Sequence, residues 1–346
     1  MPIQPLSNLN RCLYGLLRVA LRCPELPQFK ESLQALGDNE WHDMLDLARE
    51  QAVSGLVYEA ISMIDGLTNI PEDVSLDLMM EANKIEYRSR YLQTMTESII
   101  RTLREKGLHP LIMKGPSAAD LYPVPSLRVS GDIDIFLPVA EVQKARLWLW
   151  SIYTKESWGP DGSWHYSADG VEIVLHPHYF DLSVSERKLP PVPSPEATLL
   201  MLSSHILRHA MGAGVKLQQI CDIVAASRAL AGQFDPHTLR KYFRNTCTSR
   251  WNRMLSSMIR SRFGVDPGFF PNTRGHSFLS LESIIFSGGS IGQRRKLRLK
   301  LLRGCVILRK IDTAFRFVLR IPFSLYYAPK EYVRYFFALL KGNLAL

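Results

Sequence analysis

Residues 108–138 constrain the fold more than any other part of the chain, and they read LHPLIMKGPSAADLYPVPSLRVSGDIDIFLP. The apolar run 108–113 lies between Gly107 and Gly115 and is too short for an ordinary helix, so it predicts a buried strand. Gly115 permits close approach of the backbone, and Pro116 suits the first position of a helix. The free N–H groups at that helix start would face an anion such as a phosphate.

A second strand is predicted where this stretch ends, at residues 132–138. Successive strand residues point to opposite faces, so Ile133 and Ile135 share one face while Asp132 and Asp134 share the other. The Cα atoms of the two aspartates would lie about 6.6 Å apart. Both carboxylates can therefore reach one hard divalent cation, which prefers carboxylate and phosphate oxygens.

A β-hairpin is predicted at residues 163–180, SWHYSADGVEIVLHPHYF. Asp169 and Gly170 are typical of its bend. On the second arm Glu172, Val174 and His176 share one face because alternate strand residues do. Glu172 is thus the candidate for a third carboxylate beside the aspartates, and a solvent-facing strand residue is the alternative interpretation.

The run KGPSAADLYPVPSLRVSGDIDIFL resembles the polymerase-β-like nucleotidyltransferase superfamily, in particular a bacterial family known only as nucleotidyltransferases. That family has an LKG turn, then a Tyr-Pro and an Arg before an Asp-Ile-Asp strand. A strand with a carboxylate and a Leu-His pair follows, then helices with two histidines and an Asp-Ile segment. Here the later parts read VEIVLHPH at 171–178 and SHILRHAMGAGVKLQQICDIVAA at 204–226. The resemblance covers roughly residues 41–230.

The resemblance implies an enzyme that moves a nucleoside monophosphate from a nucleoside triphosphate to a hydroxyl of an acceptor, which no motif identifies. Mg²⁺ or Mn²⁺ would be the cofactor, as one ion or as two set about 3.5–4 Å apart. The implied site residues are Asp132, Asp134 and Glu172 as catalytic metal ligands; Lys114, Gly115, Ser117 and Arg128 for the nucleotide phosphates; and His176, His205, His209 and Asp222 as candidate cleft residues.

Two positions depart from the family pattern. The family more often places its third acid two residues before the histidine, where this chain has Val174, so either Glu172 serves one pleat further along or the triad is incomplete. Pro116 separates the usual adjacent glycine and serine. Structural roles also stay open, with Arg128 and Asp222 as ion-pair partners and His176 as a hydrogen-bonded structural residue.

Helical periodicity dominates outside the predicted strands. An apolar stripe at 41–52 and another at 92–103 each follow the spacing of one buried helical face, with Asp38 or Asn39 as the expected N-cap of the first. His205 and His209 have the HxxxH spacing of some zinc sites. They lack the HExxH glutamate and an acidic third ligand, so a metal-binding role is disfavoured.

The expected fold is α+β, with a small mixed β-sheet nucleotidyltransferase core embedded in a largely helical protein. A chain of 346 residues predicts more than one structural unit. We expect four parts, with the proline-rich KLPPVPSPEA (188–197) as a stiff linker or boundary: 1–106 as an N-terminal helical region, 107–188 as the nucleotidyltransferase core, 195–290 as a helical domain, and 291–346 as basic amphipathic helices.

Charge and cysteine content bear on partners and compartment. Residues 291–346 hold 13 Lys and Arg against two acids, a net charge of +11, whereas the whole chain has a net charge of +9. The first 290 residues therefore carry a net charge of about −2. This tail predicts helices docked on the body with solvated charges, and contact with an anionic membrane or a nucleic acid is the alternative. No apolar run is long enough for a membrane span. Five dispersed cysteines without CxxC spacing favour a reducing cytoplasm.

Three functions remain open at this stage. The first is the nucleotidyltransferase. The second is a glycosyltransferase, which also uses Asp-x-Asp to hold a metal and a nucleotide-sugar. The third is a protein that binds a nucleotide or a partner without catalysis, which the Val174 departure favours.

Overall fold

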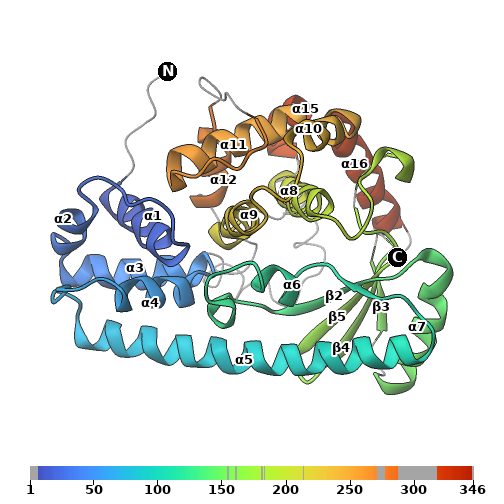
Figure 1. The fold of residues 1–346 in the computed structure, drawn as a ribbon, viewed down its shortest axis with the longest axis horizontal. Helices are drawn as coiled ribbons and strands as arrows, with labels where there is room; N and C mark the ends of the chain where they lie inside the picture. The colour runs from blue at the N-terminus through green and yellow to red at the C-terminus, as the bar shows by residue number, and fades with distance from the viewer. Residues whose placement is uncertain are drawn as a thin grey trace.

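The computed structural model describes residues 7–344 except 154–155, 160–161, 181, 183, 213, 271–276 and 287–317. It confirms the α+β class, because most described residues are helical and the strands form one five-stranded mixed sheet (Figure 1). The strand order is β1–β2–β5–β4–β3, and the bounds are β1 (Leu111–Ile112), β2 (Asp132–Phe136), β3 (Glu156–Trp158), β4 (Trp164–Ala168) and β5 (Val171–His176).

The centre of the sheet is the parallel pair of β2 and β5, and the other neighbouring strands are antiparallel. In the register of this pair Asp132 lies opposite Glu172 and Asp134 lies opposite Val174. Residues that are register partners share a face of the sheet, so the predicted acids all belong to one face.

The predicted hairpin is confirmed. Ala168 of β4 pairs with Val171 of β5, which leaves a two-residue loop. Asp169 has φ +48° and Gly170 has φ +72°. Both residues are left-handed, as a type I′ turn requires, and aspartate and glycine are the residues that adopt this conformation at least cost.

The opposite, apolar face of the sheet packs on two helices. Ile133 and Ile135 of β2 belong to one buried cluster with side chains of α5 (Glu72–Glu105) and α7 (Val139–Ile152). Figure 1 shows α5 running along one side of the whole molecule and passing under the sheet. The helices therefore cover one face and leave the face with the acids to other elements.

The predicted helical stripes lie on buried faces of α3 (Asp38–Glu50) and α5. The first stripe is too long, because α3 ends at Glu50 and Ala52 has a left-handed φ of +56°. The expected N-cap of α3 is wrong by one residue, because the cap is Gly37. The Glu40 carboxylate accepts a hydrogen bond from the Gly37 N–H at 3.0 Å. Asp38 instead lies in the first turn, where its negative charge interacts favourably with the positive end of the helix dipole.

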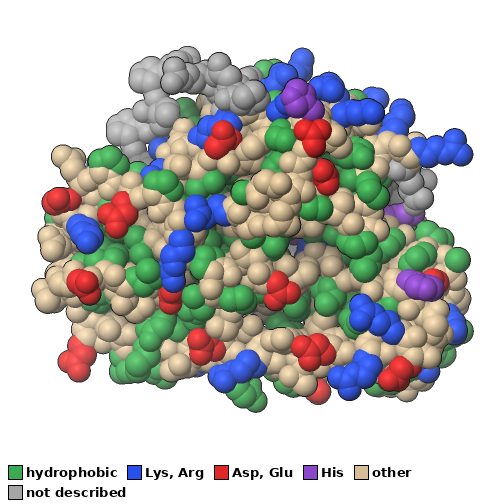
Figure 2. Space-filling model, in the orientation of Figure 1, with side chains coloured by type: hydrophobic (Ala, Val, Ile, Leu, Met, Phe, Trp, Pro, Cys, Tyr) green, Lys and Arg blue, Asp and Glu red, His purple; other side chains and the backbone are tan. Residues whose placement is uncertain are grey.

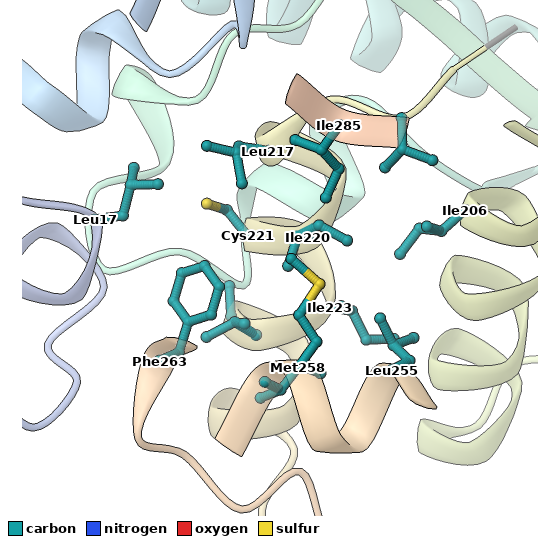
Figure 3. Close-up of a cluster of buried hydrophobic side chains, with 14 of the residues drawn as sticks. Leu17, Ile206, Leu217, Ile220, Cys221, Ile223, Leu255, Met258, Phe263 and Ile285 are labelled. Atoms are coloured by element: carbon teal, nitrogen blue, oxygen red, sulfur yellow. The ribbon is translucent and has the colours of Figure 1, made fainter. Parts of the chain in front are cut away.

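A second and larger buried cluster holds the helical body together. Figure 3 shows part of it, with α9 in the middle: its Ile220 and Ile223 meet side chains such as Met258 and Phe263 from α11. The helices of this body beyond α3 are α1 (Asn8–Ala20), α2 (Phe29–Gln34), α4 (Ser54–Ser62), α8 (Pro195–Met211), α9 (Leu217–Ala229), α10 (Pro236–Asn245), α11 (Ser249–Phe263) and α12 (Leu279–Phe286). Short helical turns α6 (Pro116–Ala119), η1 (Pro125–Leu127) and η2 (Glu186–Lys188) complete the connections.

Two helices follow in the C-terminal region, α15 (Ile321–Tyr327) and α16 (Pro329–Leu344). Ala328 and Tyr332 are buried in the main cluster, so this pair is docked on the body. Residues 291–317 of the predicted basic tail lie outside the described residues. On the face of Figure 2, acidic and basic side chains are interspersed along α5. Across the described part of the chain, no helix combines the length and the apolar character that crossing a bilayer requires.

Candidate functional site

The centre of the candidate site is Asp134, which is only 2% exposed in the middle of β2. Its Oδ1 lies 3.1 Å from Lys114 Nζ and 2.6 Å from His176 Nε2. Its Oδ2 is buried and has no hydrogen-bond partner among the described residues. One oxygen of this carboxylate is therefore fully engaged, and the other is left to bind something that the chain itself does not supply.

The pKa values of Asp132 and Asp134 are shifted in opposite directions. Burial, followed by the neighbouring Asp134 charge, raises the pKa of Asp132 to about 6. Burial also opposes ionisation of Asp134, but the charge of Lys114 and the hydrogen bond with His176 outweigh it and hold the pKa of that carboxyl well below its usual range. At neutral pH both carboxylates are therefore mostly ionised, and Asp132 is the one that takes up a proton first as the pH falls.

Glu172 lies on the same face of the sheet as the two aspartates, as predicted, but its carboxylate contacts a histidine of β4. The side chain is 56% exposed, and its Oε1 lies 2.6 Å from Nδ1 of His165 on β4. The position opposite Asp134 is filled by Val174, which is 4% exposed. The register therefore places Glu172 beside Asp132 and an apolar residue beside Asp134.

Gly115 forms the turn between β1 and α6. Its φ of +65° is one that other residues rarely adopt, and a Cβ there would lie 2.6 Å from the carbonyl oxygen of Asp132. This close approach fixes the turn against the start of β2. Lys114 precedes it and contacts Asp134, and Ser117 lies in the first turn of α6, partly buried.

Arg128 is engaged behind this turn. Its Nε donates to Asp222 Oδ1 at 2.7 Å and its Nη2 to Asp222 Oδ2 at 2.9 Å, and both side chains are more than 90% buried. Its Nη1 donates to the Gly115 carbonyl at 3.2 Å. Tyr122 also donates to Asp222 Oδ1, at 2.6 Å. The structure brings two predicted site residues, Arg128 and Asp222, together as an ion pair that supports the turn.

His205 and His209 lie on consecutive turns of α8, with their ring centroids 4.5 Å apart. Burial lowers the pKa of His209 to about 4 and the pKa of His205 well below its usual range. The nearby charge of Lys114 lowers both pKa values further. Both rings are therefore neutral at physiological pH. His205 borders the site, while Nδ1 of His209 is buried without a hydrogen-bond partner among the described residues.

A cavity of about 750 Å³ adjoins Lys114 and His176. Its other walls come from described residues between Pro177 and Val192, from α8 and from α16. Part of the predicted linker, residues 189–192, thus lines a cavity. Sequence reasoning did not single out the three arginines of this cavity. They are Arg187, Arg208 and Arg334. For Arg208 a sequence signal was available, because it stands one helical turn after His205 and shares its helical face.

The residues present fit a divalent cation that arrives with a nucleotide. Mg²⁺ commonly takes one or two carboxylates together with phosphate oxygens of the substrate. Asp132 and the buried Oδ2 of Asp134 offer such oxygens on one face. Within the described ranges no group of three or more His, Cys, Asp or Glu side chains is arranged to hold a metal ion by itself. Remaining ligands would have to come from phosphate or water.

Comparisons with known proteins agree with the strand and turn pattern. A family model described as "uncharacterised nucleotidyltransferase" matches residues 37–264, about two thirds of the chain. No curated protein and no solved structure matches the sequence. The matched range contains β1, β2, β5 and the helices α8 and α9 that bear the predicted site residues. The chain therefore belongs to this family of nucleotidyltransferases, and membership makes it a transferase.

Proposed function

We propose that this protein transfers a nucleoside monophosphate from a nucleoside triphosphate to a hydroxyl group, at the face of the sheet that bears Asp132 and Asp134. The carrying observation is the buried Oδ2 of Asp134, which has no hydrogen-bond partner among the described residues, while Oδ1 of the same carboxylate contacts Lys114. A buried polar atom without a partner costs about 1–3 kcal/mol. A ligand that binds this oxygen offsets that cost, as a nucleotide-bound cation does.

In the proposed reaction the acceptor oxygen attacks the α-phosphorus of the triphosphate. The bond from that phosphorus to the bridging oxygen breaks, and pyrophosphate leaves. The acceptor proton passes to a carboxylate on this face of the sheet. Lys114 offsets negative charge that builds on the phosphates, and the Gly115 turn with Ser117 holds the triphosphate. A bound Mg²⁺ or Mn²⁺ supplies further neutralisation of that charge.

Arg128 has a supporting role in this scheme. Its guanidinium is bound to Asp222 and to the Gly115 carbonyl, so it acts on the phosphates through the shape of the turn. We place the enzyme in the cytoplasm, in line with its dispersed cysteines.

The test uses the four nucleoside triphosphates labelled at the α-phosphorus, with Mg²⁺ or Mn²⁺ and a cell extract as the source of acceptors. Label should move to an acceptor with at least one donor, and Asp134→Asn should reduce transfer by about 100-fold or more. Asp43→Asn is the matched control, because Asp43 is an exposed carboxyl on α3, remote from the sheet. Equal transfer by both variants would refute the proposal.

A second candidate function is nucleotide binding without transfer, which the buried Val174 opposite Asp134 favours. In that case labelled triphosphate binds and Asp134→Asn weakens binding, but no donor yields a labelled product. Nucleotide-sugars tested beside the triphosphates address the glycosyltransferase alternative, because only that activity would consume them.

A further inference from the structure

The 750 Å³ cavity begins at Met113 and Lys114, beside the Gly115 turn, and extends past Asp134 toward the Phe136 end of β2. Gly115 closes against the carbonyl of Asp132, at the beginning of β2. Further along, the cavity touches Phe136 and His176, register partners at the ends of β2 and β5. The two partners of Asp134, Lys114 and His176, are both cavity walls.

The cavity wall combines positive charge with apolar surface. Arg187, Arg208 and Arg334 reach it from three separate segments, in addition to Lys114. Arg334 also contacts Glu331 at 3.2 Å. None of the described residues that line the cavity is an aspartate or glutamate. Arg334 pairs with Glu331 and Lys114 pairs with Asp134, so these four basic side chains outnumber the two acids beside them. This excess of positive charge attracts an anion and disfavours a cation.

The apolar part of the wall combines aliphatic side chains and prolines with three aromatic rings. Phe136, Tyr179 and Phe180 form a row of edge-to-face contacts, with ring centroids 5.7 and 5.1 Å apart. Tyr179 and Phe180 are themselves only 8–9% exposed. A row of rings beside a cluster of arginines fits a ligand that has an apolar or aromatic body and an anionic group. Figure 1 shows α8 over the sheet and α16 beside it, so the ligand would lie between sheet and helices.

We infer that this cavity is the acceptor site, and that the acceptor is a hydroxyl compound with an apolar or aromatic body and an anionic group such as a phosphate. The inference rests on the proposed function. Transfer requires the attacking and leaving oxygens to be roughly in line through the phosphorus. With the triphosphate held at the Gly115 turn, the attacking hydroxyl must arrive from the other end of the aspartate pair, toward which the cavity extends.

The test measures binding of 2-naphthyl phosphate to the full chain, without nucleotide or metal, by titration calorimetry. Inorganic phosphate and 2-naphthol serve as single-feature comparisons. We expect the complete probe to bind at least about tenfold more tightly than either fragment. Arg208→Gln and Arg187→Gln should each weaken it by about tenfold, because each removes a charged contact. Arg228→Gln, an exposed arginine of α9, is the matched control and should change nothing.

Three results would overturn the inference. The first is equal affinity for the probe and for one of its fragments. The second is an equal effect of the cavity variants and the control variant on binding. The third is displacement of the probe by a magnesium complex of an ATP analogue that cannot be cleaved between the α- and β-phosphates. Displacement would assign the cavity to the donor. Failure of the proposed function has a different readout, because a chain that transfers no label can still bind the probe, and circular dichroism of each variant separates lost binding from lost folding.

Discussion

Arg128 and Asp222 form a two-point ion pair across 94 residues of sequence, with N–O distances of 2.7 and 2.9 Å. The pair joins the segment between η1 and β2 to α9 in the helical body. It also holds the Gly115 turn, because the same guanidinium donates to the Gly115 carbonyl. The shape of the candidate phosphate-binding turn therefore depends on a carboxylate that comes from the far helical part of the chain.

Asp222→Ala should lower the free energy of unfolding by about 3–5 kcal/mol, because it leaves the Arg128 charge buried without its partner. Urea unfolding followed by tryptophan fluorescence measures this loss. Asp43→Ala, at an exposed position, should stay within about 0.5 kcal/mol of the unsubstituted chain. A loss below about 1 kcal/mol for Asp222→Ala would contradict the buried pair.

Gly115→Ala should destabilise the protein more than Gly107→Ala. Both glycines have positive φ, +65° and +71°, so alanine is strained at each by about 1–2 kcal/mol. Only at Gly115 would the new Cβ also meet a backbone atom, the Asp132 carbonyl oxygen at 2.6 Å, whereas Gly107 faces open space. The clash should add about 1–3 kcal/mol. Comparison of the two unfolding free energies gives the cost of the clash together with that of the ψ of −114° at Gly115. Equal values would mean that the turn does not approach β2.

The stability of the protein should fall between pH 6.5 and pH 4 through His209. Burial lowers the pKa of His209 to about 4 in the folded state, whereas an unfolded histidine titrates near 6.5. Above pH 6.5 both states are neutral and nothing is lost. As the pH falls, the unfolded state takes up a proton that the folded state refuses, so stability decreases by about 3 kcal/mol down to pH 4.

His209→Gln cannot titrate and should reduce this pH-dependent loss, which urea unfolding at pH 7, 5.5 and 4 would detect. His205 would keep its own share of the loss, since burial lowers its pKa as well. His237→Gln, at an exposed position of α10, is the matched control. An unchanged difference between pH 7 and pH 4 in His209→Gln would refute the assignment.

Val174→Asp should create a third carboxylate directly opposite Asp134, at the position where the family more often has its acid. We expect Mn²⁺ to bind about tenfold more tightly, because each added ionised ligand strengthens a hard-cation site. Without metal the variant should be less stable by about 1–3 kcal/mol, since Val174 is buried. Electron paramagnetic resonance titration measures free Mn²⁺, and Val174→Asn controls for polarity. Unchanged affinity would show that the carboxylates do not converge on one ion.

The sequence was sufficient for the features that depend on neighbouring residues. The opposite faces of Ile133 and Asp134 follow from strand alternation, and the bend at Asp169 and Gly170 follows from their left-handed conformation. Both were predicted, and both are present.

Features that depend on distant segments could not be predicted in the same way. No residue near Lys114 indicates that its ammonium contacts Asp134. Likewise, no local pattern indicates that α8 places Arg208 in the same cavity wall as described residues between Pro177 and Val192. The sequence around Arg128 does not distinguish an arginine that binds a phosphate from one that pairs with Asp222. Its partner is decided by how the helical body docks on the sheet, which no local pattern encodes.

The length of α5 has a mechanical consequence. Its first turns hold Val74 and Leu78 in the main cluster, and its last turns hold Ile99 and Leu103 under the sheet, within one uninterrupted helix of 34 residues, about 50 Å long. One residue inserted midway would rotate one end relative to the other by about 100°. Seven inserted residues would nearly restore the angle but push the ends about 10 Å apart. The helix thus sets both the distance and the rotation between the helical body and the sheet. Its interior should tolerate substitution far better than a change in length.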